Sequence, residues 1–315
     1  MIDTTITQEM LDVFTTEQRN ERSMNIDGMS VIDILKVINN EDKTVPFAIE
    51  KQLASIALLV EDIVAAFKNG GRLIYIGAGT SGRLGVLDAS ECPPTYGVPL
   101  TMVQGIIAGG SEALVRSVEG AEDETEAGKA ALNEIEFCAK DVLVGITASG
   151  QAPYVLGAML KARELGAVVG AISCNRGSKT FSYAKHSIYL DVGPEVVTGS
   201  TRMKAGTAQK LTLNMLTTAS MIRLGKVYRN LMVDLTPVNK KLVERSKRLI
   251  RQDTSCSREI ADRAFESSGH KPKIAILMVL LGMEREEAES LETESGGPIA
   301  QAILLYRQNQ EIKRG

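Results

Sequence analysis

Short apolar segments alternate with helical patterns through the middle of the chain, from residue 73 to residue 192. These segments show little polar alternation, which is typical of strands in a parallel sheet that is covered on both faces. We predict strands at residues 73–76, 101–107, 142–146, 168–173 and 187–192. The fold class that follows is α/β, with a parallel sheet as the middle of three layers and helices on both of its faces.

Apolar residues with helical spacing flank these strands. Residues 30–39 and 46–68 are predicted helices, and a long helix over residues 204–225 follows the last strand. Beyond residue 230 the strand signals stop, and short helical patterns occupy residues 237–252, 257–267, 271–281 and 284–294. The longest apolar run, 274–283, is far shorter than the roughly 20 residues that span a bilayer, so we expect a buried helix there.

This pattern predicts three parts of the chain. Residues 1–45 form a polar N-terminal arm with one helix, and residues 46–230 form the α/β domain. Residues 231–315 form a small helical domain that resembles a ubiquitin-associated three-helix bundle. We expect the bundle to serve stability or dimerisation rather than a ubiquitin-related role.

Composition narrows the class of protein. The chain has 315 residues, of which 44% are hydrophobic and 24% charged, as in ordinary globular proteins. A formal net charge of -3 leaves no basic excess for binding nucleic acid. The first ten residues lack a basic segment followed by an apolar core, so no secretory signal is expected. We therefore expect a soluble cytoplasmic protein that binds neither nucleic acid nor membranes.

Metal-ligating residues are scarce. The four cysteines form no CxxC pair, which argues against a zinc site and against a disulfide framework. The two histidines, His186 and His270, lie in no recognisable catalytic setting, and we interpret His186 as a surface or capping residue at the start of a strand. We expect no metal and no nucleotide cofactor.

A glycine-rich turn follows the first predicted strand. Gly77, Gly79 and Gly82 satisfy GxGxxG, but the acidic residue that a dinucleotide site needs about 20 positions later is absent. The turn instead contains Thr80 and Ser81. Hydroxyl groups and backbone N–H groups at a helix N-terminus suit a terminal phosphate.

Two further segments repeat this chemistry. The third strand ends in the turn 147–151 (TASGQ), and the loop 197–204 (VTGSTRMK) precedes the long helix. Each turn taken singly is more often a helix cap than a binding site, since Ser and Thr are common capping residues. In open α/β sheets, however, ligands bind at the carboxyl ends of parallel strands, where the turn after the first strand and the turn after the third strand both lie. We predict that the three segments line one pocket for a terminal phosphate.

These residues resemble known families. The turns 79–82 and 147–150 and the segment 198–210 are similar to a sugar isomerase (SIS) domain, a phosphosugar-binding module. Longer motifs resemble the N-acetylmuramic acid 6-phosphate etherase family, from about residue 17 to the end of the chain: 87–96 (LDASECPPTY), 118–123 (VEGAED) and 198–207 (TGSTRMKAGT).

The resemblance implies a substrate and a reaction. The substrate is a phosphorylated amino sugar, and the D-lactyl ether at its C3 is cleaved by elimination and then hydration. Glu91 matches the family's proton donor, and Glu122 matches the second catalytic glutamate, which removes the C2 proton. The family is dimeric, so a homodimer is expected. The predicted substrate-binding residues are Gly79, Thr80, Ser81, Gly82, Thr147, Ser149, Gly150, Gln151, Ser200, Thr201 and Lys204.

Two alternatives remain open at this point. SIS domains also occur in sugar-phosphate sensors such as the glucokinase regulatory protein, which need the phosphate turns but no acid–base pair. The presence of both Glu91 and Glu122 favours the enzyme. A dinucleotide-dependent enzyme is a more distant alternative, because the ribose-binding acid is missing.

Overall fold

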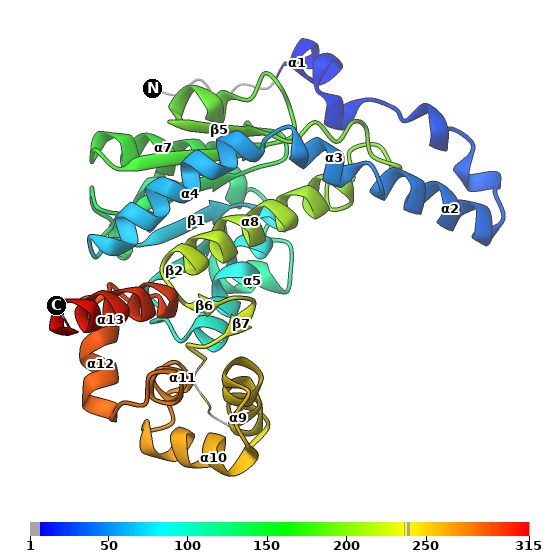
Figure 1. The fold of residues 1–315 in the computed structure, drawn as a ribbon. Helices are drawn as coiled ribbons and strands as arrows, with labels where there is room; N and C mark the ends of the chain where they lie inside the picture. The colour runs from blue at the N-terminus through cyan, green and yellow to red at the C-terminus, as the bar shows by residue number, and fades with distance from the viewer. Residues whose placement is uncertain (1–6, 236, 238–239, 315) are drawn as a thin grey trace. The chain divides into compact units, whose positions relative to one another are not determined.

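A computed structural model describes residues 7–235, 237 and 240–314 (Figure 1). The chain divides into two compact units. The first consists of Met1–Ser90 and Leu100–Thr217, and the second of Glu91–Pro99 and Thr218–Gly315. The predicted domain boundaries at residues 45 and 230 remain a proposal about domain organisation.

A five-stranded parallel sheet forms the middle of the first unit, with the strand order β2-β1-β3-β4-β5. Its strands are β1 (Leu73–Gly77), β2 (Val103–Ile107), β3 (Val142–Ile146), β4 (Val168–Ser173) and β5 (His186–Tyr189). The five predicted strands are thus confirmed. Strand β5 ends earlier than predicted because the Val192 N–H donates to the carbonyl of Leu190 and turns the chain.

Helices cover both faces of this sheet, as predicted (Figure 1). On one face, α4 (Leu53–Lys68) packs closely enough that a Cβ at Gly170 of β4 would lie 2.8 Å from Leu59. On the other, α7 (Pro153–Glu164) lies over β3, and a Cβ at Gly145 would lie 2.6 Å from the sulfur of Met159. Helix α6 (Thr125–Glu134) packs against α7. The sheet core is therefore buried on both sides, which explains its apolar strands.

The N-terminal segment contains more structure than its pattern predicts. Helix α1 (Gln8–Val13) and the 3-10 turns η1 (Thr15–Glu17), η2 (Glu21–Ser23) and η3 (Ile26–Gly28) precede α2 (Val31–Asp42). Ser30 caps α2 by accepting from the Asp33 N–H. The single helix predicted over 46–68 is wrong, because the chain leaves helical geometry at Gln52 (φ -108°, ψ 0°) between α3 (Val45–Glu50) and α4.

Helices α5 (Gly79–Tyr96) and α8 (Lys204–Arg223) complete the first unit, and their last turns belong to the second. Helix α8 ends close to the predicted residue 225. Between the sheet strands lie the 3-10 turns η4 (Gly110–Leu114), η5 (Ala121–Asp123) and η6 (Lys179–Tyr183).

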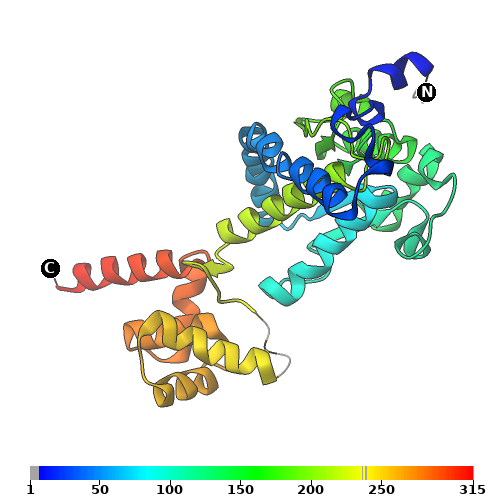
Figure 2. The ribbon, with the colours of Figure 1, turned by 90° about the vertical axis from the view of Figure 1, so that its right-hand side faces the viewer.

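The second unit is helical around one apolar helix. Helix α11 (Pro272–Leu281) packs against α9 (Lys240–Thr254), α10 (Arg258–Ser267), α12 (Arg285–Glu294) and α13 (Ile299–Arg314), drawn yellow to red in Figure 2. The buried helix predicted for the apolar run 274–283 is confirmed, since residues 272–277 are buried.

Two elements of the second unit differ from the prediction. A two-stranded antiparallel ladder, β6 (Val227–Tyr228) with β7 (Leu231–Met232), shows that the expected end of strand structure at residue 230 was wrong. Strands of two residues are too short to produce a periodic signal. Helix α13 was also not predicted. Within the part of the chain that the structure describes, none of the helices has the length and apolar character needed to cross a bilayer.

Candidate functional site

The order of the strands brings two predicted turns together. The chain passes from β1 to β2 on one side, while β3 pairs with the other side of β1 and leads on to β4 and β5. Gly77 at the end of β1 is in register with Ile146 at the end of β3. The turns that follow these strands therefore begin side by side, at the point where open α/β sheets bind their ligands.

Close backbone approach explains the glycines of the first turn. A Cβ on Gly77 would lie 2.7 Å from the Gly82 nitrogen, and a Cβ on Gly82 would lie 2.7 Å from the Gly77 carbonyl oxygen. Gly79 has φ +52°, and the space beside it is open to 4 Å. The turn therefore requires glycine at 77 and 82, while Gly79 leaves the entry to α5 accessible.

Ser81 points into the protein rather than outward. It is 6% exposed, and its hydroxyl donates to Oε1 of Gln209 in α8 at 2.9 Å. The Nε2 of Gln209 is buried and has no hydrogen-bond partner among the described residues. A hydroxyl has only one proton to donate, so Ser81 must release Gln209 before it can donate to a ligand. Nothing in the sequence distinguished Gln209 from the other residues of its helix.

The second turn is stabilised by its own hydroxyl groups. Thr147 Oγ1 accepts from the Gly150 N–H at 3.3 Å, and Ser149 Oγ accepts from the Gln151 N–H at 3.2 Å. The two hydroxyl oxygens lie 3.2 Å apart, so one donates to the other and one proton remains for a ligand. Gln151 donates through Nε2 to the Gly177 carbonyl at 3.3 Å, and its buried Oε1 has no partner among the described residues.

The start of α8 packs against the first turn. A Cβ on Gly206 would lie 3.3 Å from Cγ2 of Thr80, and Gln209 bonds to Ser81 as described. In the loop before α8, Ser200 and Thr201 are partly exposed, and their hydroxyl groups have no hydrogen bonds among the described residues. The two hydroxyls stay candidates for substrate binding.

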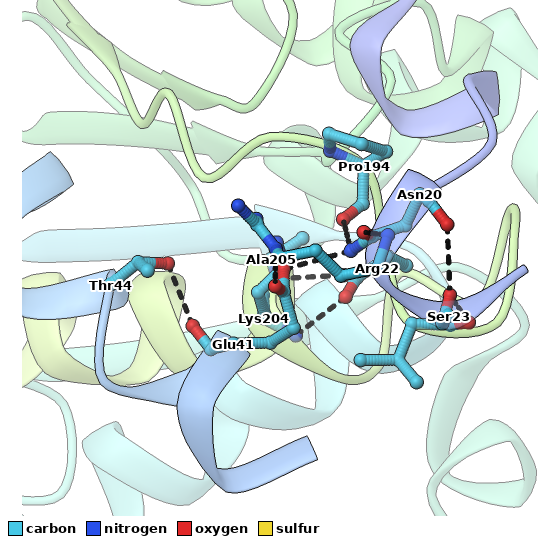
Figure 3. A network of polar contacts seen from close by, with 10 residues as sticks. Asn20, Arg22, Ser23, Glu41, Thr44, Pro194, Lys204 and Ala205 are labelled. Carbon is cyan, nitrogen blue, oxygen red and sulfur yellow. Dashed lines mark hydrogen bonds and ion pairs between the residues drawn. The ribbon is translucent and has the colours of Figure 1, made fainter. Parts of the chain in front are cut away.

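Lys204, a predicted substrate-binding residue, lies in a buried ion pair. It is 1% exposed, and its ammonium donates to Glu41 of α2 at 2.7 Å (Figure 3). Glu41 also accepts from Asn20 at 2.8 Å and from Arg22. Burial alone would raise the pKa of Glu41, but these three hydrogen bonds lower it to about 2. The Lys204 cation is therefore neutralised by Glu41 inside the protein.

A second buried carboxylate fixes the beginning of α8. Glu195, 1% exposed, accepts from the backbone N–H groups of Lys204 and Ala205 at 2.9 Å each. Burial raises the pKa of Glu195, although these two bonds oppose the shift. Free N–H groups of the first helical turn are thereby satisfied, which holds the loop 197–203 against the helix it precedes.

The N-terminal arm connects the second turn to this loop. Asn175, which follows β4, donates through Nδ2 to Thr16 Oγ1 at 3.0 Å and to the Ala148 carbonyl at 3.3 Å. The Gly199 N–H donates to the Thr16 carbonyl at 3.2 Å. Thr16 and Asn175 are each 1% exposed. Neither was predicted, because contacts between such distant parts of the chain leave no local pattern in the sequence.

Glu122 borders a cavity beside the first turn. The cavity has a volume of about 180 Å³, and its lining includes Gly79, Arg83, Arg116 and Glu122. Partial desolvation raises the pKa of the Glu122 carboxyl, and the carboxylates of Asp123 and Glu119 raise it further. A raised pKa brings a carboxyl group closer to the pH at which it can both accept and donate a proton.

Glu91 lies inside helix α5. Helix α5 continues through Pro93 and Pro94 to Tyr96 and ends at Gly97, whose φ is +63°. Glu91 is exposed and belongs to the second unit, whereas Glu122 belongs to the first. The joint action of the two glutamates remains a prediction.

The two histidines make structural contacts, and the cysteines form no disulfide among the described residues. His186 begins β5 as predicted, but the expectation of a surface residue was wrong: it is 9% exposed, with Nε2 2.6 Å from Asp62. His270 stacks on Phe265. The four cysteines are free thiols. Across residues 7–235, 237 and 240–314, no three His, Cys, Asp or Glu side chains form a group that could hold a metal ion.

The parallel sheet and the two adjoining turns are those of an SIS domain. Residues 55–163 match the model of the glucokinase regulatory protein N-terminal SIS domain, and this range includes β1, β2, β3 and both turns. A solved structure, phosphoheptose isomerase GmhA from Neisseria gonorrhoeae, is 19% identical over 61% of this chain and 98% of its own, with a TM-score of 0.43.

Relatives over nearly the whole chain identify the family. The N-acetylmuramic acid 6-phosphate etherase of Glaesserella parasuis is 58% identical over 92% of this chain and 95% of its own. The N-acetylmuramic acid 6-phosphate etherase of Actinobacillus pleuropneumoniae serotype 7 is 55% identical over 93% of this chain and 97% of its own length. The chain belongs to the N-acetylmuramic acid 6-phosphate etherase family.

Proposed function

We propose that this protein cleaves the D-lactyl ether of N-acetylmuramic acid 6-phosphate in the cytoplasm, giving N-acetylglucosamine 6-phosphate and D-lactate. The observation that carries the proposal is the meeting of two hydroxyl-rich turns at the carboxyl ends of β1 and β3, next to a cavity bordered by Glu122. Relatives named N-acetylmuramic acid 6-phosphate etherase support the choice of substrate. The reaction serves catabolism of amino sugars from the cell wall.

The chemistry is that of a carbon–oxygen lyase. The C2 proton becomes acidic when the sugar ring opens and C1 is an aldehyde. Glu122 removes this proton, the C3–O bond breaks with its electron pair on the ether oxygen, and Glu91 protonates that oxygen as D-lactate leaves. Water then adds at C3 of the unsaturated aldehyde, and C2 regains a proton. The raised pKa of Glu122 suits a group that takes up a proton and returns it.

Release of D-lactate tests the proposal directly. Purified protein incubated with N-acetylmuramic acid 6-phosphate should form D-lactate and N-acetylglucosamine 6-phosphate in equal amounts. The alternative is a sugar-phosphate sensor without catalytic activity. It is supported by the match of residues 55–163 to the SIS domain of a regulatory protein. Tight binding of the substrate with no release of lactate would favour the sensor.

The first prediction concerns the phosphate. Ser149, and Ser81 once it has released Gln209, donate to the 6-phosphate. Replacing Ser149 by Ala should therefore weaken binding of N-acetylglucosamine 6-phosphate by about one to two orders of magnitude. Calorimetric titration measures this loss. Ser178→Ala is the matched control, because Ser178 donates to the Gly150 carbonyl of the same turn at 3.4 Å. Unchanged affinity in Ser81→Ala, Ser149→Ala and the double variant would remove the turns from the site.

The second prediction concerns cofactors. Two carboxyl groups are sufficient for the acid–base steps, so turnover should survive exhaustive dialysis against a chelator and needs no added nucleotide. The measurement is the rate of D-lactate formation before and after chelation. Loss of turnover that one particular metal ion restores is the contrary result.

We also propose a homodimer. Exposed apolar side chains gather on the consecutive helices α2 and α3: Val31 (74%), Ile32 (58%), Leu35 (54%) and Phe47 (65%). Exposed apolar patches of this kind mark association surfaces. Light scattering of the purified protein measures the mass of the assembly.

A further inference from the structure

Arg83 is a cation without an ion-pair partner in the cavity that contains Glu122. It lies in the first turn of α5 after Ser81 and is partly buried. Its Nε donates to the Leu114 carbonyl at 3.3 Å, and its Nη2 donates to the Arg116 carbonyl at 3.1 Å. No carboxylate of the described residues forms an ion pair with it. The two backbone contacts fix the direction of the guanidinium.

The guanidinium has donors to spare. It carries five N–H groups in a planar fork, of which the two carbonyl contacts use two. A fork of this shape matches a carboxylate or a phosphate through paired hydrogen bonds. The neighbouring Arg116 is mostly exposed and lies 3.8 Å from Glu112, so it is less closely held. Arg83 is therefore the oriented cation of the cavity.

The proposed substrate has two anionic groups, and their positions on the sugar distinguish them. The phosphate is on C6, whereas the lactyl carboxylate is attached through the ether oxygen on C3. Glu122 acts on the C2 proton, and C3 is the next carbon. Arg83 and Glu122 line the same cavity, together with Gly79 of the first turn, so Arg83 can reach an anion attached at C3 while the hydroxyl groups of the turns bind the phosphate.

We propose that Arg83 binds the carboxylate of the lactyl group and thereby selects sugar phosphates that carry this substituent. The inference rests on the proposed etherase function. Arg83 contacts the part of the substrate that leaves, so its effect should be present for the substrate and absent for the product N-acetylglucosamine 6-phosphate, which has no carboxylate.

The test compares these two ligands in Arg83→Met. The kcat/KM for N-acetylmuramic acid 6-phosphate should fall about 10- to 100-fold, the effect of losing hydrogen bonds to a charged group. The inhibition constant of N-acetylglucosamine 6-phosphate should stay within about twofold of the parent value. Arg83→Lys, which retains the charge, should recover part of the loss. Arg163→Met, on α7, removes a cation outside this cavity and should change neither value.

Each other outcome has a separate meaning. Equal weakening of both ligands would show that Arg83 binds the phosphate or only supports the loop 114–116, and the proposal would be wrong. An unchanged kcat/KM would also overturn it. Failure of the parent protein to release any D-lactate would instead contradict the proposed function, before Arg83 is considered.

Discussion

Replacing Glu122 by Gln is expected to slow D-lactate release by about 10²–10⁴-fold, while affinity for the substrate stays close to that of the parent. Gln has nearly the same shape as Glu but cannot accept the C2 proton. Glu122 is exposed and has no hydrogen bond among the described residues, so folding should be little affected. The measurement is the steady-state rate of D-lactate formation together with calorimetric affinity.

Proton exchange at C2 distinguishes the two glutamates. In deuterated solvent, Glu122→Gln should lose exchange of the C2 proton in the sugar phosphate. Glu91→Gln should keep some exchange while failing to release lactate, because removal of the C2 proton does not require the acid at the ether oxygen. Parental exchange in Glu122→Gln and its loss in Glu91→Gln would reverse the two roles. Normal lactate release by both variants would contradict the carboxylate mechanism itself.

The second large effect is expected on stability. Replacing Lys204 by Met removes one of the donors to Glu41 and leaves that carboxylate buried with less compensation. Breaking a buried ion pair typically costs about 3–5 kcal/mol of unfolding free energy, and the remaining bonds from Asn20 and Arg22 place this variant at the lower end. Urea unfolding followed by circular dichroism measures the loss.

Acid titration and a double variant provide the controls. The pKa of Glu41 is lowered from 4.5 to about 2, so its contribution to stability is complete above pH 4.5 and is lost as the pH falls towards 2. Lys204→Met with Glu41→Leu should recover much of the loss, since no buried charge is left unpaired. Arg22 also loses Glu41 in this double variant, but its side chain is 67% exposed and stays solvated. A Lys204→Met protein of parental stability but with weakened phosphosugar binding would return Lys204 to the substrate site.

Local sequence patterns predicted the layers well. Apolar runs such as Val142–Ile146 identified the strands, because a strand buried on both faces has to be apolar along its whole length. The hydroxyl–glycine turns after β1 and β3 were also predicted, and the strand order brought them together. The break at Gln52 and the ladder of β6 with β7 leave no periodic signal, so they could not be predicted.

The site was harder to predict where contacts link distant segments. Lys204 was predicted to bind substrate because it belongs to the hydroxyl-rich loop 197–204, but its ion-pair partner Glu41 comes from a different helix far away in the chain. Thr16, Asn175 and Gln209 were missed for the same reason. Helix α5 continues past Glu91 and includes both Pro93 and Pro94, which the residue types alone do not indicate. Residue type indicated the chemistry, whereas the fold decided which groups are free to act.

The most direct test of elimination followed by hydration is the fate of water oxygen. The reaction is run in oxygen-18-labelled water, and both products are analysed by mass spectrometry. Elimination breaks the C3–O bond, so the label should enter the C3 hydroxyl of N-acetylglucosamine 6-phosphate while D-lactate keeps the original ether oxygen. Label in the hydroxyl of D-lactate, with none at C3 of the sugar, would show cleavage on the other side of the ether oxygen and would contradict this account.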